Sequence, residues 1–159
     1  MTTISRGARV LAGGCGMEQD PRRILIVDPD PWFTGRLKAT LAPQGYDMEA
    51  AEGIIQAAQR MRDVRFDCLI VDEDLPEMKG HDAVPVLKAI SPQVPIIVTA
   101  ARNSLAVESS IRRQDVFFYH VKTFDMHELQ MAVRDALRKV GKRPGGRLAA
   151  GGTAQPSAE

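Results

Sequence analysis

The chain has 159 residues, of which 44% are hydrophobic and 26% are charged, and its formal net charge is +1. This length and composition are typical of one soluble globular domain, and the near-neutral charge provides no electrostatic surface for nucleic acid or a membrane. No apolar stretch reaches the roughly 18–20 residues of a transmembrane helix. The two cysteines, Cys15 and Cys68, form no disulfide framework, so we expect a cytoplasmic protein with Cys68 as a buried free thiol.

The two ends of the chain differ in composition from its middle. Residues 1–21 are Gly-rich without periodicity, and residues 141–159 are rich in Gly, Ala and Pro, so we expect a flexible leader and a disordered tail. Residues 11–15 have a slight similarity to a lipoprotein cleavage site, but the apolar stretch before Cys15 is shorter than the ~7–15 residues of a signal core. The start codon is left open between Met1 and Met17. The expected folded domain is residues 22–140.

Short, continuously apolar runs predict strands that are covered on both faces. The first run is residues 24–27, and a weaker candidate at residues 46–50 follows it. The later runs are residues 68–71, 94–98 and 116–118.

Helical patterns fill the gaps between these runs. Asp30 is a candidate N-cap with Pro31 at the first helical position, and apolar residues then recur at Phe33, Leu37 and Leu41. Three further helices are marked by Ile54, Ala58 and Met61, by Val84, Leu87 and Ile90, and more faintly by residues 105–111.

The last helical pattern has the clearest start signal. Asp125 is the expected cap and Glu128 stands three residues later, as in a capping box. One face of this helix is apolar, at Met126, Leu129, Val133, Leu137 and Val140.

Strand and helix alternate about five times along the chain. This order predicts an α/β fold, a doubly wound five-stranded parallel sheet with right-handed crossovers and helices on both faces. Ligands of such sheets bind beyond the carboxyl ends of the strands. Chemistry is therefore expected at that edge.

Polar residues of complementary type follow four of the predicted strands. They are Asp28, Asp72, Thr99 and Lys122. In a parallel sheet these positions converge, so two carboxylates, a hydroxyl and an ammonium should share one pocket.

The segments around these residues carry a family resemblance. Residues 24–28, 71–80, 97–100 and 121–122 read ILIVD, VDEDLPEMKG, IVTA and VK. In order and spacing they resemble bacterial response-regulator receiver domains, and the resemblance covers about residues 22–140. It implies a flavodoxin-like fold of the receiver type and a role in two-component signalling.

The resemblance also implies a role for each matching residue. Asp72 would attack the phosphorus of a phosphohistidine and form an aspartyl phosphate. Asp28, Asp72 and the backbone carbonyl of Asp74 would hold Mg²⁺. Lys122 would pair with the phosphoryl oxygens, because phosphoryl transfer depends on positioning and charge neutralisation.

A switch pair is implied in the same way. Thr99 would swing its hydroxyl toward the phosphoryl group, and Tyr119 would move inward with it. On the residues alone, Thr99 and Asp28 could simply satisfy backbone groups at strand ends, and Tyr119 could be a half-buried sheet aromatic.

Two positions depart from the family pattern. The family has a second acid, a direct metal ligand, where this chain has Pro29, so weakened Mg²⁺ binding is expected, with the Asp74 carboxylate as a possible compensating ligand. Asp30 is better explained as the helix cap. After Lys122 the family has a cis-proline, but this chain has Thr123, for which a cis bond costs about 2.5–4 kcal/mol.

The remaining ionisable residues have no pattern that predicts a site. His81, His120 and His127 have no spaced partners, and we expect none of them to bind a metal. The basic residues between Arg138 and Arg143 are expected to favour the helix C-terminus rather than DNA.

The leading hypothesis is a stand-alone receiver domain, which is not an enzyme beyond self-catalysed phosphorylation and dephosphorylation. Its partners would be a histidine kinase or phosphotransfer protein and an output protein at the surface of the fourth helix, fifth strand and fifth helix, with a homodimer possible. The alternative is a pseudo-receiver that binds proteins without phosphorylation. A flavodoxin-like enzyme has no support, because no Gly-rich phosphate loop follows the first strand.

Overall fold

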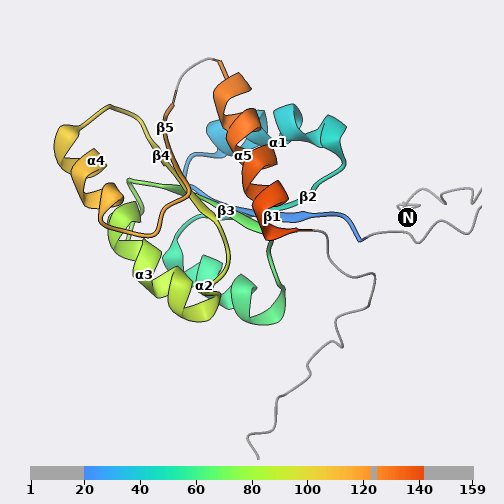
Figure 1. Ribbon diagram of the computed structural model, residues 1–159, viewed down its shortest axis with the longest axis horizontal. Coiled ribbons are helices and arrows are strands. Elements are labelled where there is room, and N and C mark those ends of the chain that lie inside the picture. The colour runs from blue at the N-terminus through green and yellow to red at the C-terminus, as the bar shows by residue number, and fades with distance from the viewer. Residues whose placement is uncertain (1–19, 123–124, 142–159) are drawn as a thin grey trace, which may run out of the picture.

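The computed structural model describes residues 20–122 and 125–141 of the chain. Its single sheet is parallel, with the strand order β2-β1-β3-β4-β5. Helices α1 and α5 cover one face, and α2, α3 and α4 cover the other (Figure 1). The expected doubly wound α/β fold is confirmed. The expected leader and tail, with Cys15, lie almost wholly outside the described residues, as does Thr123.

The sheet and its helices follow the expected alternation. In chain order the elements are β1 (Arg23–Val27), α1 (Pro31–Leu41), a 3₁₀ turn (Ala42–Gln44), β2 (Asp47–Ala51), α2 (Ile54–Asp63), β3 (Cys68–Asp72), α3 (Gly80–Ile90), β4 (Ile96–Ala100), α4 (Leu105–Arg112), β5 (Phe118–Val121) and α5 (His127–Val140).

The fifth strand lies further along the chain than the apolar pattern predicts. The expected strand was residues 116–118, but β5 begins at Phe118 and pairs with β4 from Ile97↔Phe118 to Ala100↔Val121. Because Tyr119 and His120 are polar or titratable, they interrupt the apolar run, although both belong to the strand. β5 is also an edge strand, where the demand for a continuously apolar sequence is weaker.

The starts of the first and last helices show two kinds of cap. Asp30 caps α1 as expected, since its Oδ1 accepts a hydrogen bond from the amide of Trp32 at 2.9 Å, with Pro31 in the first turn. The expected start of α5 at Asp125 is displaced. The helix begins at His127, whose amide donates to Asp125 Oδ1 at 2.8 Å. Glu128 does not close a capping box, because its carboxylate is bonded to His120.

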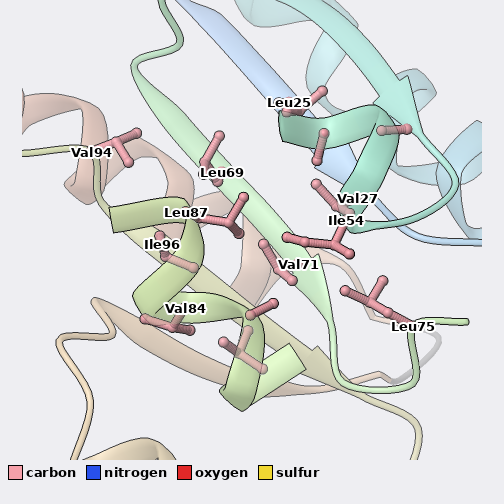
Figure 2. Packing of buried hydrophobic residues seen from close by; sticks show 14 of the residues in the cluster. Leu25, Val27, Ile54, Leu69, Val71, Leu75, Val84, Leu87, Val94 and Ile96 are labelled. Atoms are coloured by element: carbon pink, nitrogen blue, oxygen red, sulfur yellow. The ribbon is translucent and has the colours of Figure 1, made fainter. Parts of the chain in front are cut away.

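Two apolar clusters hold the layers together, one on each face of the sheet. On the side of α2 and α3, Figure 2 shows Leu69 and Val71 of β3 pointing toward Ile54 and Leu87. The cluster on the side of α1 and α5 contains Phe33, Leu37, Leu129 and Val133, among others. Successive residues of each strand point to opposite faces, so a residue's position along a strand decides which cluster it joins.

Two further findings concern single segments. None of the helices in the described ranges is long and apolar enough to cross a bilayer. Cys68 is a fully buried free thiol, as expected, and burial raises the pKa of that thiol.

Candidate functional site

Four residues form a row across the carboxyl ends of adjacent strands. Asp72 pairs with Thr99, and Thr99 pairs with His120, in the register of the sheet. Asp28 extends the row by one strand, because Val27 and Val71 are paired and each is followed by an aspartate. Laterally paired residues of a parallel sheet point to the same face. This face is the one covered by α1 and α5.

The centre of the site is a pair of carboxylates that share one ammonium. Lys122 Nζ lies 2.8 Å from Asp28 Oδ2 and 3.0 Å from Asp72 Oδ1. Both aspartates are buried, with exposed fractions of 4% and 5%. The sequence prediction that these three residues converge at the sheet edge therefore agrees with the geometry.

Burial and ion pairing shift the pKa values of Asp28 and Lys122 in opposite directions. Burial raises the pKa of Asp28, and the bond to Lys122 acts against that shift. Burial also acts to lower the pKa of Lys122, but its bonds to Asp28 and Asp72 outweigh this, so the pKa of Lys122 is raised overall. The lysine is therefore held in its charged form between the two carboxyl groups.

The backbone and a ring fix the direction of Lys122. Its amide donates to the carbonyl of Ala100 at 2.7 Å, which continues the pairing of β4 and β5. Its ammonium lies 4.3 Å from the centroid of the buried Phe33 ring, within the range of a cation–π contact. Thr123 and Phe124, which follow Lys122, are outside the described residues.

The two expected switch residues lie on adjacent strands but on opposite faces of the sheet. Thr99 is fully buried in the row. Tyr119 is half-buried, packs against the cluster on the side of α2 and α3, and donates a hydrogen bond to the carbonyl of Arg102 at 3.4 Å. Burial raises the pKa of the Tyr119 phenol. The sequence expectation of a half-buried sheet aromatic thus describes its present position.

The acids that flank the site are engaged in local structure. Asp74 is exposed, and its carboxylate lies 2.7 Å from Lys79 Nζ, which closes the β3–α3 connection on itself. Asp30 caps α1, and its amide donates to Asp28 Oδ1 at 2.8 Å. Pro29 contributes no polar side chain. A groove of about 510 Å³ beside Asp28 is lined by Pro29, Thr34 and residues of β2 and α2, among others.

Glycine is required where β3 meets α3. A Cβ on Gly80 would lie 2.4 Å from the carbonyl oxygen of Asp72, a clash with backbone that a side-chain rotation cannot relieve. The amide of Gly80 donates to the carbonyl of Glu73 at 2.8 Å. The backbone of the candidate phosphoacceptor and the start of α3 are therefore in direct contact.

Glu73, which follows Asp72, has its own set of partners. It is buried, accepts a hydrogen bond from the amide of His81 at 3.0 Å and pairs with His81 Nδ1. The sequence prediction that His81 is isolated was wrong. The pair is separated by eight residues across an irregular connection, so no helical or strand spacing indicates it.

Glu77 joins the same connection to a different helix. Its two carboxylate oxygens accept hydrogen bonds from the amides of Ile54 and Ile55, at 3.1 and 3.3 Å, at the start of α2. Gly53 makes room for this carboxylate, since a Cβ there would lie 2.3 Å from Glu77 Oε1. The connection after Asp72 is thus anchored to both α2 and α3.

His120 also has a partner that sequence reasoning missed. The imidazole is 1% exposed, and Nδ1 lies 2.9 Å from Glu128 Oε2 in the first turn of α5. The available signal was strand parity, because His120 stands two residues before Lys122 and so shares its face of the sheet. His127 is exposed, as expected.

The donor set for a divalent cation consists of oxygens. Within residues 20–122 and 125–141, no three side chains of His, Cys, Asp or Glu are grouped closely enough to hold a metal ion. Asp28 and Asp72 provide two carboxylates, and Mg²⁺ commonly uses one or two and keeps several waters. These two carboxylates fit such an ion. Because position 29 is a proline, the site has one side-chain ligand fewer than it would have with an aspartate there.

Comparison with known families agrees with this arrangement. The family model described as the response regulator receiver domain matches residues 24–134. The chain belongs to the response-regulator receiver family, whose domain serves regulation in two-component systems.

Curated relatives place the domain within larger proteins. The transcriptional regulatory protein ZraR of Klebsiella oxytoca is 28% identical over 114 residues, which cover 72% of this chain and 26% of that protein. The response regulator MprA of Mycobacterium sp. (strain KMS) is 28% identical over 125 residues, covering 79% of this chain and 54% of that protein. The chain thus spans about a quarter to a half of the length of these relatives.

Solved structures share the fold. A signal receiver domain from Pseudomonas fluorescens Pf-5 has a TM-score of 0.72 and 25% identity, covering 76% of this chain and 98% of that one. A CheY-like receiver domain protein from Methanospirillum hungatei JF-1 has a TM-score of 0.71 at 22% identity, covering 76% and 97%. The response regulator TrrA of Thermotoga maritima, solved with Mg²⁺-BeF, has a TM-score of 0.66 at 27% identity, covering 73% and 99%.

Proposed function

We propose that this receiver domain accepts a phosphoryl group on Asp72 from a histidine kinase or a phosphotransfer protein. The observation that carries the proposal is the ammonium of Lys122 held between Asp72 and Asp28, at 3.0 and 2.8 Å, at the carboxyl edge of the sheet. A buried carboxylate that shares its cation with a second carboxylate is incompletely neutralised. Such a group suits a reaction that brings further positive charge to the site.

The charges of the site favour phosphoryl transfer with a divalent cation. Asp28 and Asp72 together with Lys122 carry a formal charge of −1 when both carboxyl groups are ionised. Asp28, Asp72 and the backbone carbonyl of Asp74 would hold Mg²⁺, which supplies charge neutralisation at the phosphoryl oxygens when bound. Lys122 supplies the second positive charge, from the side of β5, and Thr99 supplies a hydroxyl from β4.

Pro29 sets the expected strength of the metal site. With a proline at this position, the β1–α1 connection offers Asp28 as its metal-binding carboxylate, because Asp30 is committed to the cap of α1. Asp74 could replace the missing ligand only by leaving Lys79. The proposal therefore includes weakened Mg²⁺ affinity.

Output is proposed to depend on binding to another protein. The surface formed by α4, β5 and α5 contains Tyr119, and Leu105 at the start of α4 is an exposed large apolar residue. A homodimer through the same surface is a second possibility. We place these interactions in the cytoplasm, on the basis of the free thiol of Cys68.

One set of observations favours the pseudo-receiver as the second candidate. Pro29 contributes no ligand, and the carboxylate of Asp74, the candidate replacement, is engaged by Lys79. A domain of this kind would bind its partner in one constitutive conformation.

Intact-protein mass after incubation with acetyl phosphate and Mg²⁺ separates the two candidates. A phosphoryl adduct is expected on the wild-type protein and not on Asp72→Asn or after removal of Mg²⁺ by a chelator. An adduct that persists in Asp72→Asn would contradict the assignment of the phosphoacceptor.

A second measurement isolates the contribution of Pro29. Trp32, which is 61% exposed and four residues beyond Asp28, is a suitable fluorescence reporter of Mg²⁺ binding. Pro29→Asp should bind Mg²⁺ more tightly than the wild type and label faster, because it adds a carboxylate ligand. No adduct on either protein would support the pseudo-receiver.

A further inference from the structure

The row at the carboxyl edge contains a histidine that the proposed phosphoryl chemistry does not use. His120 of β5 is paired in register with Thr99 of β4, and Thr99 is in turn paired with Asp72 of β3. Adjacent strands lie about 4.7–4.9 Å apart. Thr99 therefore has Asp72 on one side and His120 on the other, with all three side chains on the same face of the sheet.

Both neighbours in this pair have a buried polar atom without a partner. Thr99 Oγ1 and His120 Nε2 are inaccessible to solvent, and neither forms a hydrogen bond in the described part of the chain. The two residues are 0% and 1% exposed. Buried polar groups in folded proteins are nearly always hydrogen-bonded, so two unpaired atoms on laterally paired residues call for a common explanation.

The contact with Glu128 decides which hydrogen-bonding role is left to Nε2. His120 Nδ1 lies 2.9 Å from Glu128 Oε2, and an ionised carboxylate only accepts hydrogen bonds. Nδ1 therefore carries the proton, and in the neutral imidazole Nε2 is then an acceptor. The hydroxyl of Thr99 is a donor, so the two unpaired atoms are complementary.

We propose that His120 is a positioning residue for Thr99, and that its Nε2 accepts the hydrogen bond of the Thr99 hydroxyl in the unphosphorylated protein. The proposed bond requires the Thr99 hydroxyl to turn toward Nε2 while the imidazole keeps its contact with Glu128. Glu128 acts from α5 by fixing the tautomer of the imidazole.

One consequence rests on the proposed function at Asp72. A phosphoryl group on Asp72 is a second acceptor for the Thr99 hydroxyl, on the opposite side from His120. The imidazole and the phosphoryl group then compete for one donor. His120 thereby lowers the occupancy of the bond between Thr99 and the phosphoryl group, and so the stability of the phosphorylated form.

The hydrogen bond itself is tested without phosphorylation, by ¹⁵N NMR of the histidine side chains in the full chain. Thr99→Val removes the donor, so the resonance of the unprotonated Nε2 of His120 should move downfield by several ppm. Thr99→Ser keeps a hydroxyl and should leave the resonance close to its wild-type position. A ring that carries its proton on Nε2 rather than on Nδ1 would also overturn the proposal.

Thr34→Val is the matched control. Thr34 is another buried threonine whose hydroxyl lacks a partner in the described residues, but it lies beside β2, at the opposite edge of the sheet from β5. This variant should leave the resonance of His120 unchanged. If Thr99→Val moves the resonance no more than Thr34→Val does, the proposal is overturned.

The competition is tested by labelling with acetyl phosphate and Mg²⁺. His120→Leu removes the competing acceptor, and its labelled fraction should rise by up to about fivefold, the ratio that one ordinary hydrogen bond is worth. Thermal unfolding of each variant identifies any that fails to fold, and Thr99→Val in the NMR experiment does not depend on His120→Leu. Labelling of folded His120→Leu at or below the wild-type fraction would overturn the competition.

Failure of the wild type to label would count against the proposed function alone, because the NMR result decides the hydrogen bond independently.

Discussion

Asp72 and Glu73 are adjacent buried carboxylates on opposite sides of the sheet, and they differ in their bonding partners. Glu73 has two bonds of its own, from the amide and the ring of His81, at the start of α3. Asp72 shares the single ammonium of Lys122 with Asp28. A fully partnered buried carboxylate serves the fold, whereas one that must share its cation indicates a site where further positive charge is useful.

The largest expected effect is a loss of stability when the Glu73 carboxylate is removed. Glu73→Ala should reduce the free energy of unfolding by about 2 kcal/mol, because the start of α3 loses an acceptor and His81 loses its partner. Glu73→Gln, which keeps the shape and one acceptor oxygen, should lose less. Urea denaturation measures both variants.

Urea denaturation of Asp72→Asn tests whether the neighbouring carboxylate matters less to stability. Loss of one of two like charges beside Lys122 should change the free energy of unfolding much less than Glu73→Ala does. A loss for Asp72→Asn as large as that for Glu73→Ala would contradict the division between the two sides.

The second expected effect is a pH dependence that originates on the side of Asp72. The pKa of Asp28 is raised above its ordinary value of 3.8 in the folded protein, chiefly by burial. The folded state then holds this proton to higher pH than the unfolded state, so the contribution to stability is present at low pH and is lost as pH rises from about 3.8 through the raised pKa. One such group gives a slope of at most about 1.4 kcal/mol per pH unit.

Asp28→Asn removes this slope. Its free energy of unfolding, measured by urea titration at a series of pH values, should increase relative to the wild type across that window and then level off. Asp30→Asn is the control, since Asp30 is an exposed carboxylate two residues away. Identical pH profiles for the two variants would show that the buried carboxyl is not the source.

The smallest expected effect concerns the carboxylate that joins the connection after Asp72 to α2. Glu77→Ala should cost about 1 kcal/mol, the usual value of a helix cap, because the amides of Ile54 and Ile55 lose their acceptor. Hydrogen exchange of those two amides should accelerate, whereas Glu77→Gln should keep most of their protection. Unchanged exchange in Glu77→Ala would mean that Glu77 does not act as the cap.

The sequence was sufficient to predict the fold wherever burial alone decides the residue type. Four apolar runs predicted four of the strands, and the residues that follow them predicted the convergence of Asp28, Asp72 and Lys122. The expected fourth and fifth strands each began two residues too early, at residue 94 instead of Ile96 and at residue 116 instead of Phe118. In β5, the polar residues Tyr119 and His120 interrupt the apolar pattern. The apolar pattern of a sequence indicates which residues are buried only when those residues are apolar, so it does not detect a buried polar residue such as His120.

The pairs that sequence reasoning missed have a common physical reason. Glu73 with His81 and His120 with Glu128 are each eight residues apart across a connection, and Glu77 reaches a helix more than twenty residues away. No repeat of 2 or 3.6 residues links such positions. Only the path of the connections, which depends on the packed structure, brings these side chains together.

The sheet fixes the spacing of the row formed by Asp28, Asp72, Thr99 and His120. Asp72, Thr99 and His120 stand on three adjacent strands and Asp28 directly follows a fourth, so the separation between neighbouring backbones is one strand spacing of about 4.7–4.9 Å. The connections above the row can change in length or sequence and thereby alter which ion or partner reaches it. The intervals between the backbone positions of its four residues are set by the pairing of the strands and stay the same.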